Sequence, residues 1–290
     1  MKKSFSFILI VISGFLFAQE IQEKSLLWEI SGKELPQKSY LYGTMHIMCK
    51  VDVQMTPRIE KAFDATESVL LELDMDDPSM MVKMMQATFA KDGKTVSEKL
   101  GAELAAKVDT VLRANSPMTL PMVENLNLQT LSMQIGMFAL DCEMDLGYDM
   151  LFVQHAQAEN KNIEGLESVE LQIETLLSQS DEESKTAIEY IVNNFDEVKS
   201  EMNKLISTYK SEDVQGLYDM TEATLEDPKY PQGNLEDFLD NRNKAWIPII
   251  EKSIHEKPMF IAVGAAHLAG ENGVINLLRK QGYTVKAVEN

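Results

Sequence analysis

The chain has 290 residues, of which 46 are Asp or Glu and 27 are Lys or Arg, giving a formal net charge of −19. Such a charge repels nucleic acid and anionic membranes, which argues against both as partners. The charge is spread along the chain and mainly favours solubility. Neither a GxGxxG nor a P-loop pattern occurs, so no nucleotide cofactor is expected.

The first eighteen residues have the layout of a secretory signal peptide. Two lysines precede an apolar run, Phe7 to Phe17, that ends at Ala18 before a polar segment. The run is shorter than the roughly 20 apolar residues of a spanning helix, although an uncleaved anchor is the alternative. We expect an exported protein, periplasmic or secreted, whose mature domain is 19–290. Loss of the two lysines makes its charge −21, and no stable membrane span remains.

Short β-strands are predicted at the start of the mature chain. Residues 25–46 contain two apolar runs around a turn of Gly, Pro and Lys, which is typical of a β-hairpin. Thr56 and Pro57 supply the cap and the first residue of a helix that ends near Ala65. The segment 68–73, SVLLEL, follows as a short buried strand that carries one carboxylate.

The remaining sequence predicts a helical region and a second piece of the sheet. Residues 76–256 are rich in Met, Leu, Glu, Gln and Lys, as in helices, with breaks at Pro and Gly. Residues 257–290 read as a strand, a loop, a helix stopped by Gly282 and another strand, which is a βαβ unit with parallel strands. We therefore predict an α/β fold. Its mixed or parallel sheet comes from 25–75 and 257–290, with a large helical insertion.

The sequence contains two cysteines, Cys49 and Cys142. An exported chain meets an oxidising compartment, where an even number of cysteines permits a disulfide. Two buried free thiols are the competing interpretation, because the sequence does not give the separation of the two Cα atoms. A catalytic thiol is a third.

Two of the four histidines follow a strand in the same short pattern, GxxH. His46 ends the segment 43–46 after the strand SYLY, and His267 ends 264–267 after the strand MFIAV. Gly allows a sharp turn, so each His can lean over the edge of the sheet. Neighbouring parallel strands would bring the two rings together. Imidazole serves as a metal ligand and as a general base, so the pair fits either role; a hydrogen-bonded structural His is the alternative.

Five segments resemble, in chain order, the pattern of the TraB/GumN family, which includes the Tiki metalloproteases and is more distantly similar to erythromycin esterase-like proteins. They are YGTMH, LLELD, IEGLES, NRNKAW and AVGAAHLAGENGV. The resemblance covers essentially the whole mature chain, although the middle matches only by helical character and by Gly147-Tyr148-Asp149. It implies an α/β core with a helical insertion and a site built around the two GxxH motifs.

Glu72 is the natural third member of this site, because its strand would lie beside the hairpin. A carboxylate near two histidines completes a three-ligand hydrolytic metal site or acts as a general base. Asp74 lies at strand spacing on the same face and is a further candidate, although both carboxylates could mark a solvated strand end. We predict His46, Glu72 and His267 as ligands of a divalent metal, with manganese, cobalt and zinc all admissible.

Arg242 and Asn243 are predicted on a helix that Asn234 caps, with Trp246 on the same face as Arg242. In the family such an arginine belongs to a recurring RNxxW pattern. Its functional interpretation is a guanidinium that holds a substrate carboxylate or stabilises an oxyanion; the structural one is an interaction with Trp246 in the core. The candidate catalytic residues are thus His46, Glu72, Arg242 and His267.

Other residues are weaker candidates. Asp149 is predicted to cap the helix that carries His155, and Glu167, in the family's GLE motif, is a candidate to approach the site. His155 and His255 are expected at the surface. The methionines between residues 75 and 85 could suggest copper, but their helical spacing favours an adaptable apolar face, either packed as core or lining a groove for peptides.

The first functional hypothesis is metal-dependent hydrolysis of a peptide or a small carbonyl substrate. A metal would polarise the carbonyl and activate a bound water. The alternatives are a non-catalytic periplasmic protein that binds a peptide, haem or a metal, and a metal-free esterase-like hydrolase in which a histidine activates water directly. The substrate and the oligomeric state do not follow from the sequence.

Overall fold

The computed structural model describes residues 20–140, 142–145, 147–229 and 233–289. The predicted signal peptide, 1–18, lies outside these residues. In the described part of the chain, no helix combines the length and the apolar character that crossing a membrane requires.

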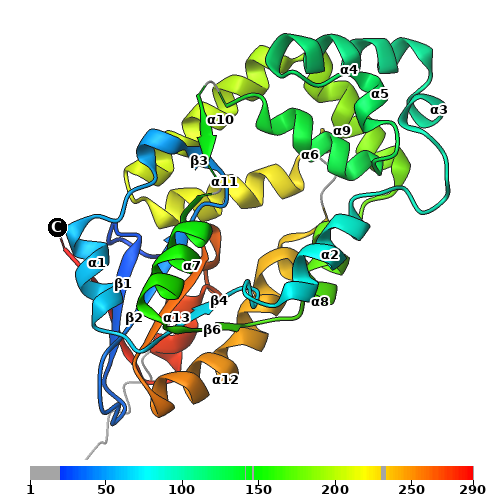
Figure 1. The fold of residues 1–290 in the computed structure, drawn as a ribbon. Helices are drawn as coiled ribbons and strands as arrows, with labels where there is room; N and C mark the ends of the chain where they lie inside the picture. Colours follow the sequence, from blue (N-terminus) through cyan, green and yellow to red (C-terminus); the bar gives the residue numbers. More distant parts are fainter. Residues whose placement is uncertain (1–19, 141, 146, 230–232, 290) are drawn as a thin grey trace, which may run out of the picture.

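A six-stranded sheet forms the centre of the α/β part (Figure 1). Its strands are β1 (Leu27–Ser31), β2 (Ser39–Thr44), β4 (Ser68–Leu71), β6 (Asn162–Gly165), β7 (Met259–Gly264) and β8 (Thr284–Ala287). Their order is β6-β4-β7-β2-β1-β8. Strand β1 is antiparallel to both of its neighbours, and the other neighbouring pairs are parallel. This confirms an α/β fold with a mixed sheet.

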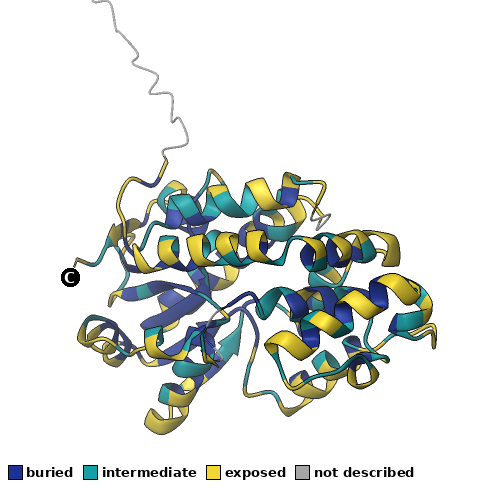
Figure 2. Ribbon diagram, turned by 90° about the horizontal axis from the view of Figure 1, so that it is seen from above, coloured by how far each residue is buried: buried dark blue, intermediate teal, exposed yellow. Residues whose placement is uncertain are grey.

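Both faces of the sheet are covered, which explains why its strands read as continuous apolar runs. The first five residues of β7 are all buried, and the sheet appears as a dark band in Figure 2. On one face pack α1 (Pro57–Asp64) and α7 (Gly147–Glu159). The rings of Phe63 in α1 and Phe152 in α7 lie 5.1 and 4.8 Å from that of Phe260 in β7. Aromatic contacts thus fix both helices to the central strand.

The C-terminal part of the chain contributes the helices that precede and follow β7. A π-helical turn, η2 (Glu236–Asp240), runs into α12 (Asn241–Glu256), and Asn234 Oδ1 accepts a hydrogen bond from the backbone N–H of Asp237. The predicted cap is therefore confirmed. After β7 come η3 (Ala265–His267) and α13 (Val274–Lys280), which contacts both α12 and β8.

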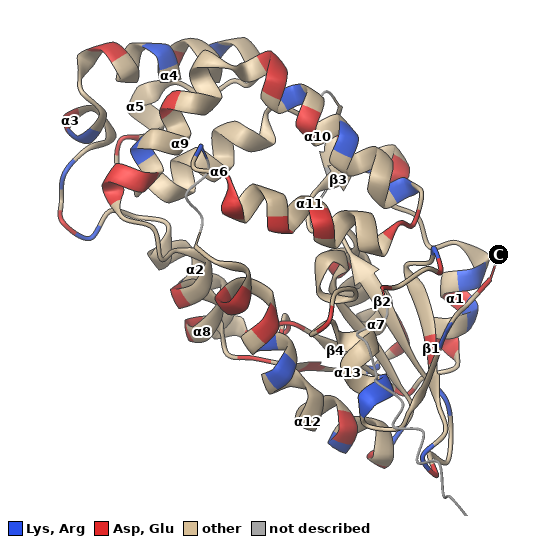
Figure 3. Cartoon of the chain, turned by 180° about the vertical axis from the view of Figure 1, so that it is seen from behind, with Lys and Arg blue, Asp and Glu red and all other residues tan. Residues whose placement is uncertain are grey.

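The helical insertion has its own hydrophobic core, separate from that of the sheet. Helices α4, α6 and α9 contribute most of its buried Leu, Ile and Val side chains, and α2 packs on α8 beside it. Asp and Glu are spread over both parts of the molecule (Figure 3). The helices are α2 (Pro78–Ala87), α3 (Val96–Leu100), α4 (Ala102–Asn115), α5 (Leu120–Val123), α6 (Leu128–Met137), α8 (Val169–Leu176), α9 (Asp181–Asn193), α10 (Phe195–Lys210) and α11 (Val214–Glu226).

The predicted elements near the N-terminus are confirmed, with one shift. Strands β1 and β2 form the hairpin, and α1 begins at Pro57 with the Thr56 side chain accepting from the backbone N–H of Ile59. Strand β4 ends at Leu71, so Glu72 is the first residue after the strand rather than part of it. A carboxylate just beyond a strand end can turn toward the edge of the sheet.

Two features of the sheet were not part of the prediction. Strands β7 and β8 run in the same direction but are not neighbours, because the hairpin of β1 and β2 lies between them. The region 76–256 is not only helical, since it also contains β6 and the two-residue strand β5 (Met144–Asp145). Strand β6 has the sequence NIEG, which is too short and polar to stand out from its helical surroundings.

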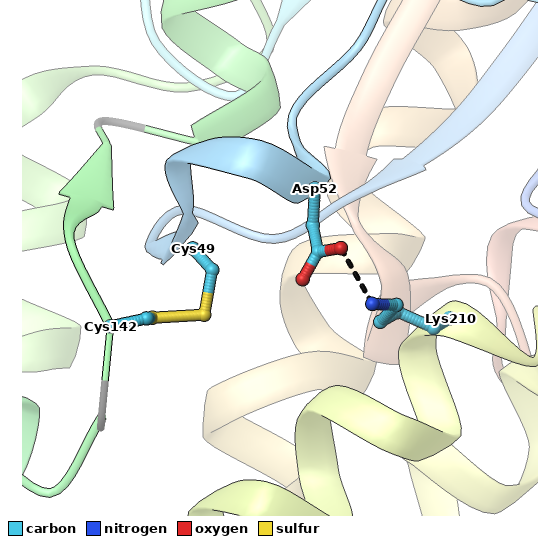
Figure 4. Close-up of a disulfide and its surroundings, with 4 residues drawn as sticks. All are labelled: Cys49, Asp52, Cys142 and Lys210. Carbon is cyan, nitrogen blue, oxygen red and sulfur yellow. Dashed lines mark hydrogen bonds and ion pairs between the residues drawn. A yellow bond between two sulfur atoms is a disulfide. The ribbon is translucent and has the colours of Figure 1, made fainter.

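The two cysteines form a disulfide, Cys49–Cys142, with their Cα atoms 5.6 Å apart (Figure 4). This confirms the disulfide interpretation over the two alternatives. Cys49 ends the short strand β3 (Met48–Cys49), which pairs with β5. Near the bridge, Asp52 of the 3-10 helix η1 (Lys50–Asp52) forms an ion pair with Lys210 of α10.

Replacing both cysteines by serine is expected to lower the free energy of unfolding by about 2–4 kcal/mol, because the bridge closes a long loop in the unfolded chain. The separation along the sequence is 93 residues. Urea denaturation in oxidising buffer measures the change, and reduced wild-type protein should match the double variant. Equal stability of oxidised and reduced wild type would contradict the expectation.

Candidate functional site

The two GxxH motifs end at the same edge of the sheet because β2 and β7 are parallel neighbours, with Thr44 opposite Gly264. Strand β4 lies on the other side of β7 and brings Glu72 to the same edge. A Cβ atom placed on Gly264 would lie 3.3 Å from Glu72 Oε1, 3.5 Å from His267 Cδ2 and 3.8 Å from His46 Nε2. The three side chains predicted as a cluster therefore surround one glycine.

His46 is held by a buried carboxylate from the helical region. Its Nδ1 lies 2.7 Å from Asp149 Oδ2, while Thr44 Oγ1 donates a hydrogen bond of 3.0 Å to Asp149 Oδ1. The Asp149 side chain is 10 % exposed and that of His46 61 % exposed. The charge of Asp149 and its hydrogen bond raise the pKa of His46 to about 9. Because Nδ1 faces Asp149, Nε2 is the nitrogen directed at Gly264.

The prediction that Asp149 caps a helix missed this contact with His46. Asp149 does lie in the first turn of α7, but its carboxylate crosses to the loop after β2. The approach depends on Gly147, whose φ is +69° and whose Cβ, if present, would lie 2.2 Å from the carbonyl oxygen of Met45. In the sequence, only the match of Gly147-Tyr148-Asp149 to the family pattern pointed to a role for Asp149 at the site.

Glu72 is buried and accepts hydrogen bonds on both oxygens. Gly264 N donates to Oε1 at 2.7 Å, and Arg242 Nη2 and Gln172 Nε2 donate to Oε2 at 2.7 and 3.1 Å. Burial alone would raise its pKa, but the charges of His46 and Arg242, with the hydrogen bond from the Gly264 amide, lower the pKa to about 2. Glu72 is therefore ionised at neutral pH.

Arg242 connects Glu72 to a second buried carboxylate, Glu167. Its Nη2 lies 2.7 Å from Glu167 Oε1, and its Nε donates to Oε2 at 3.1 Å. Trp246 Nε1 donates to the same Oε2 at 3.2 Å, and the guanidinium carbon lies 4.9 Å from the Trp246 ring. Arg242 therefore contacts Glu72 at the site and also packs on Trp246, as the structural interpretation predicted. Glu167 reaches the site through Arg242.

His267 is buried and has partners on both ring nitrogens. Nδ1 lies 2.6 Å from Asn243 Oδ1, which can only accept a hydrogen bond, so this nitrogen carries the proton. Nε2 then presents its lone pair to Arg242 Nη1 at 3.1 Å. Burial lowers the pKa of His267 to about 3, and the positive charge of Arg242 acts in the same direction. His267 is therefore a neutral acceptor.

The predicted metal ligands do not fit a metal ion as they are arranged. The lone pair of His267 Nε2 faces a guanidinium, which would repel a divalent cation, and both oxygens of Glu72 already accept hydrogen bonds. Within the described ranges, no three His, Cys, Asp or Glu side chains are grouped so that they could hold a metal. Metal binding by His46, Glu72 and His267 stays a prediction that requires Arg242 to move away from His267.

The remaining candidates named from the sequence lie outside the cluster. Asp74 is largely exposed, and partial desolvation of its carboxylate, with neighbouring Asp76, raises its pKa. His155 packs against the ring of Phe63, and His255 is exposed and lies 3.0 Å from the hydroxyl of Tyr283. Among the methionines of α2, Met80 packs as core against α8, as one interpretation predicted. Met81 and Met85 are exposed.

Comparison with known proteins gives one match. Residues 26–287, nearly the whole chain, match the model of the TraB/PrgY/gumN family. No curated protein matches the chain, and no solved structure does.

Proposed function

Because the chain belongs to the TraB/PrgY/gumN family and carries a paired histidine and carboxylate beside a buried arginine, we propose that it is a hydrolase of peptides or other carbonyl compounds. One observation carries the proposal. His46 has its Nδ1 fixed by Asp149 and its Nε2 directed at the space around Gly264. A histidine oriented by a buried carboxylate is the arrangement of a general base.

In the proposed reaction, His46 Nε2 takes a proton from a water molecule that attacks the substrate carbonyl. The Nδ1–H of His46 donates to Asp149, which keeps the required tautomer and stabilises the imidazolium as it forms. The ionised Glu72, whose Oε1 also lies beside Gly264, adds to this stabilisation. His46 then returns the proton to the leaving group.

Arg242 is proposed to hold Glu72 in place beside His46 rather than to donate to the substrate, because its five N–H groups already donate to Glu72, Glu167, His267 and the Phe238 carbonyl. Glu72 and Glu167 hold its guanidinium on two sides, so it needs no reorganisation during the reaction. His267 accepts a hydrogen bond from Arg242 and fixes the remaining nitrogen. His267 is thus a positioning residue in this proposal.

The pH dependence of hydrolysis tests the role of His46. Its pKa of about 9 leaves it protonated at neutral pH, so kcat/KM should rise with pH, by about tenfold per unit, and level off near pH 9. Replacing Asp149 by Asn removes the charge that raises the pKa, so the rise should move toward about pH 6.5. Initial rates with an aryl ester from pH 5 to 10 measure both profiles, and a flat wild-type profile would contradict the assignment.

A metal-dependent reaction is the second candidate. The observation that favours it is the Asp149 contact, because metal-ligating histidines commonly donate their other nitrogen to a carboxylate. Measuring bound metal separates the metal-dependent from the metal-free reaction. Wild type, His46→Ala and His267→Ala are each incubated with manganese, cobalt or zinc before the measurement. Stoichiometric binding lost in both variants would replace the metal-free proposal, whereas wild type without bound metal would leave it standing.

Export from the cytoplasm is a further part of the proposal. The Cys49–Cys142 disulfide supports it, because such bridges persist in oxidising compartments. Residues 1–18 supply the expected signal.

A further inference from the structure

A cavity of about 510 Å³ opens beside Arg242, between α8 and the start of α12. Its walls include Leu171, Phe238 and Ala245, and two exposed carboxylates, Glu174 and Asp237, also line it. The volume lies in the range that small ligands or substrate side chains occupy. The cavity therefore has room for part of a substrate next to the proposed reacting groups.

The cavity and the proposed catalytic cluster share the same two helices. On α8, Leu171 lines the cavity while the next residue, Gln172, donates a hydrogen bond to Glu72. On α12, Asn241 and Arg242 both line the cavity, and Arg242 also holds Glu72. A substrate group in the cavity would thus contact Arg242, which holds Glu72, and would lie against the helix whose Gln172 also holds Glu72.

The electrostatic character of the cavity is negative. Asp237 accepts hydrogen bonds from the neutral amides of Asn234 and Asn241, at 2.9 and 3.1 Å. In the described part of the chain, neither Asp237 nor Glu174 forms an ion pair with Lys or Arg. The charge of Arg242 is already shared between Glu72 and Glu167. Two carboxylates thus face the cavity without a compensating cation.

We propose that this cavity is the subsite that selects the substrate, and that it accepts a side chain with an apolar stem and a cationic end, such as that of Lys or Arg. Leu171, Phe238 and Ala245 would contact the stem, and Glu174 and Asp237 the cation. The proposal rests on the proposed hydrolase function, because it places the substrate beside Arg242.

A matched pair of substrates tests the subsite. The 4-nitrophenyl esters of Nα-acetyl-lysine and Nα-acetyl-norleucine have stems of the same length and differ in the terminal charge. Wild type should hydrolyse the lysine ester with a kcat/KM about fivefold higher at low ionic strength, and added salt should reduce the ratio. Glu174→Gln should lower the ratio toward one, because the ammonium group of the lysine ester loses a carboxylate partner. Glu182→Gln, which removes one exposed charge from α9, is the control and should keep the ratio.

A binding measurement separates this subsite from the hydrolase proposal. The amides of the same two acylated residues are titrated into wild type and Glu174→Gln, and the dissociation constants are measured by NMR. Tighter binding of the lysine amide, weakened in Glu174→Gln, supports the subsite even if neither ester is hydrolysed, an outcome that would overturn only the hydrolase proposal. Equal binding of the two amides, or hydrolysis of both esters at equal rates, would overturn the subsite.

Discussion

Replacing His46 by Ala is expected to reduce ester or peptide hydrolysis by about a hundred- to ten-thousandfold, the range that a general base contributes. The reason is that no other described group near Gly264 can act as the base in place of His46. Glu72 has a pKa of about 2 and is too weak a base, and the lone pair of His267 is directed at Arg242. Steady-state kinetics of wild type and variant measure the loss.

Two further variants make this expectation specific. His255→Ala removes an exposed histidine in the last turn of α12, where it contacts the hydroxyl of Tyr283. This variant should keep full activity. His46→Ala should retain the far-UV circular dichroism of wild type, because the His46 side chain is 61 % exposed and packs little of the core. Equal activity of His46→Ala and His255→Ala would contradict the assignment of His46.

Replacing Arg242 by Met is expected to lower the free energy of unfolding by about 3–5 kcal/mol, which is the usual effect of removing one partner from a buried ion pair. Arg242 is 5 % exposed on its side chain, and Glu72 and Glu167 are 6 % and 2 % exposed. Both carboxylates would be left buried without a cation. Urea denaturation at pH 7 measures the change.

The matched control is Arg113→Met, which removes an arginine from an exposed pair with Asp109 on α4. That substitution should cost less than about 1 kcal/mol, because solvent screens the pair. Adding Glu72→Gln and Glu167→Gln to Arg242→Met should recover part of the lost stability, since the buried charges are then removed. A cost for Arg242→Met no larger than that for Arg113→Met would show that the buried cluster does not contribute as described.

The parts of the site that could be predicted from the sequence are those set by local patterns. The apolar runs before His46 and His267 identify strands, and the glycine in each motif marks the turn after the strand. Parallel pairing of β2 with β7 then places the two motifs at one edge. Glu72 follows by the same reasoning, with an error of one or two residues in the strand end.

The parts that could not be predicted depend on packing between distant segments. Asp149 meets His46 across 103 residues, through a close approach that only Gly147 permits. The contact between Arg242 Nη1 and His267 Nε2 decides whether His267 can bind a metal, and it follows from the placement of α12 over the sheet edge. No periodicity in the sequence encodes either contact.

The most direct test of the account is the activity of exhaustively chelated wild-type protein on an aryl ester and on a mixture of peptides, with metal content measured on the same sample. Hydrolysis that persists without metal and disappears in His46→Ala is the expected result, because the proposed base is an imidazole oriented by Asp149. Activity lost on chelation and restored by a single divalent metal would contradict the metal-free mechanism. No hydrolysis of either substrate class, with or without metal, would contradict the hydrolase proposal and favour a binding protein.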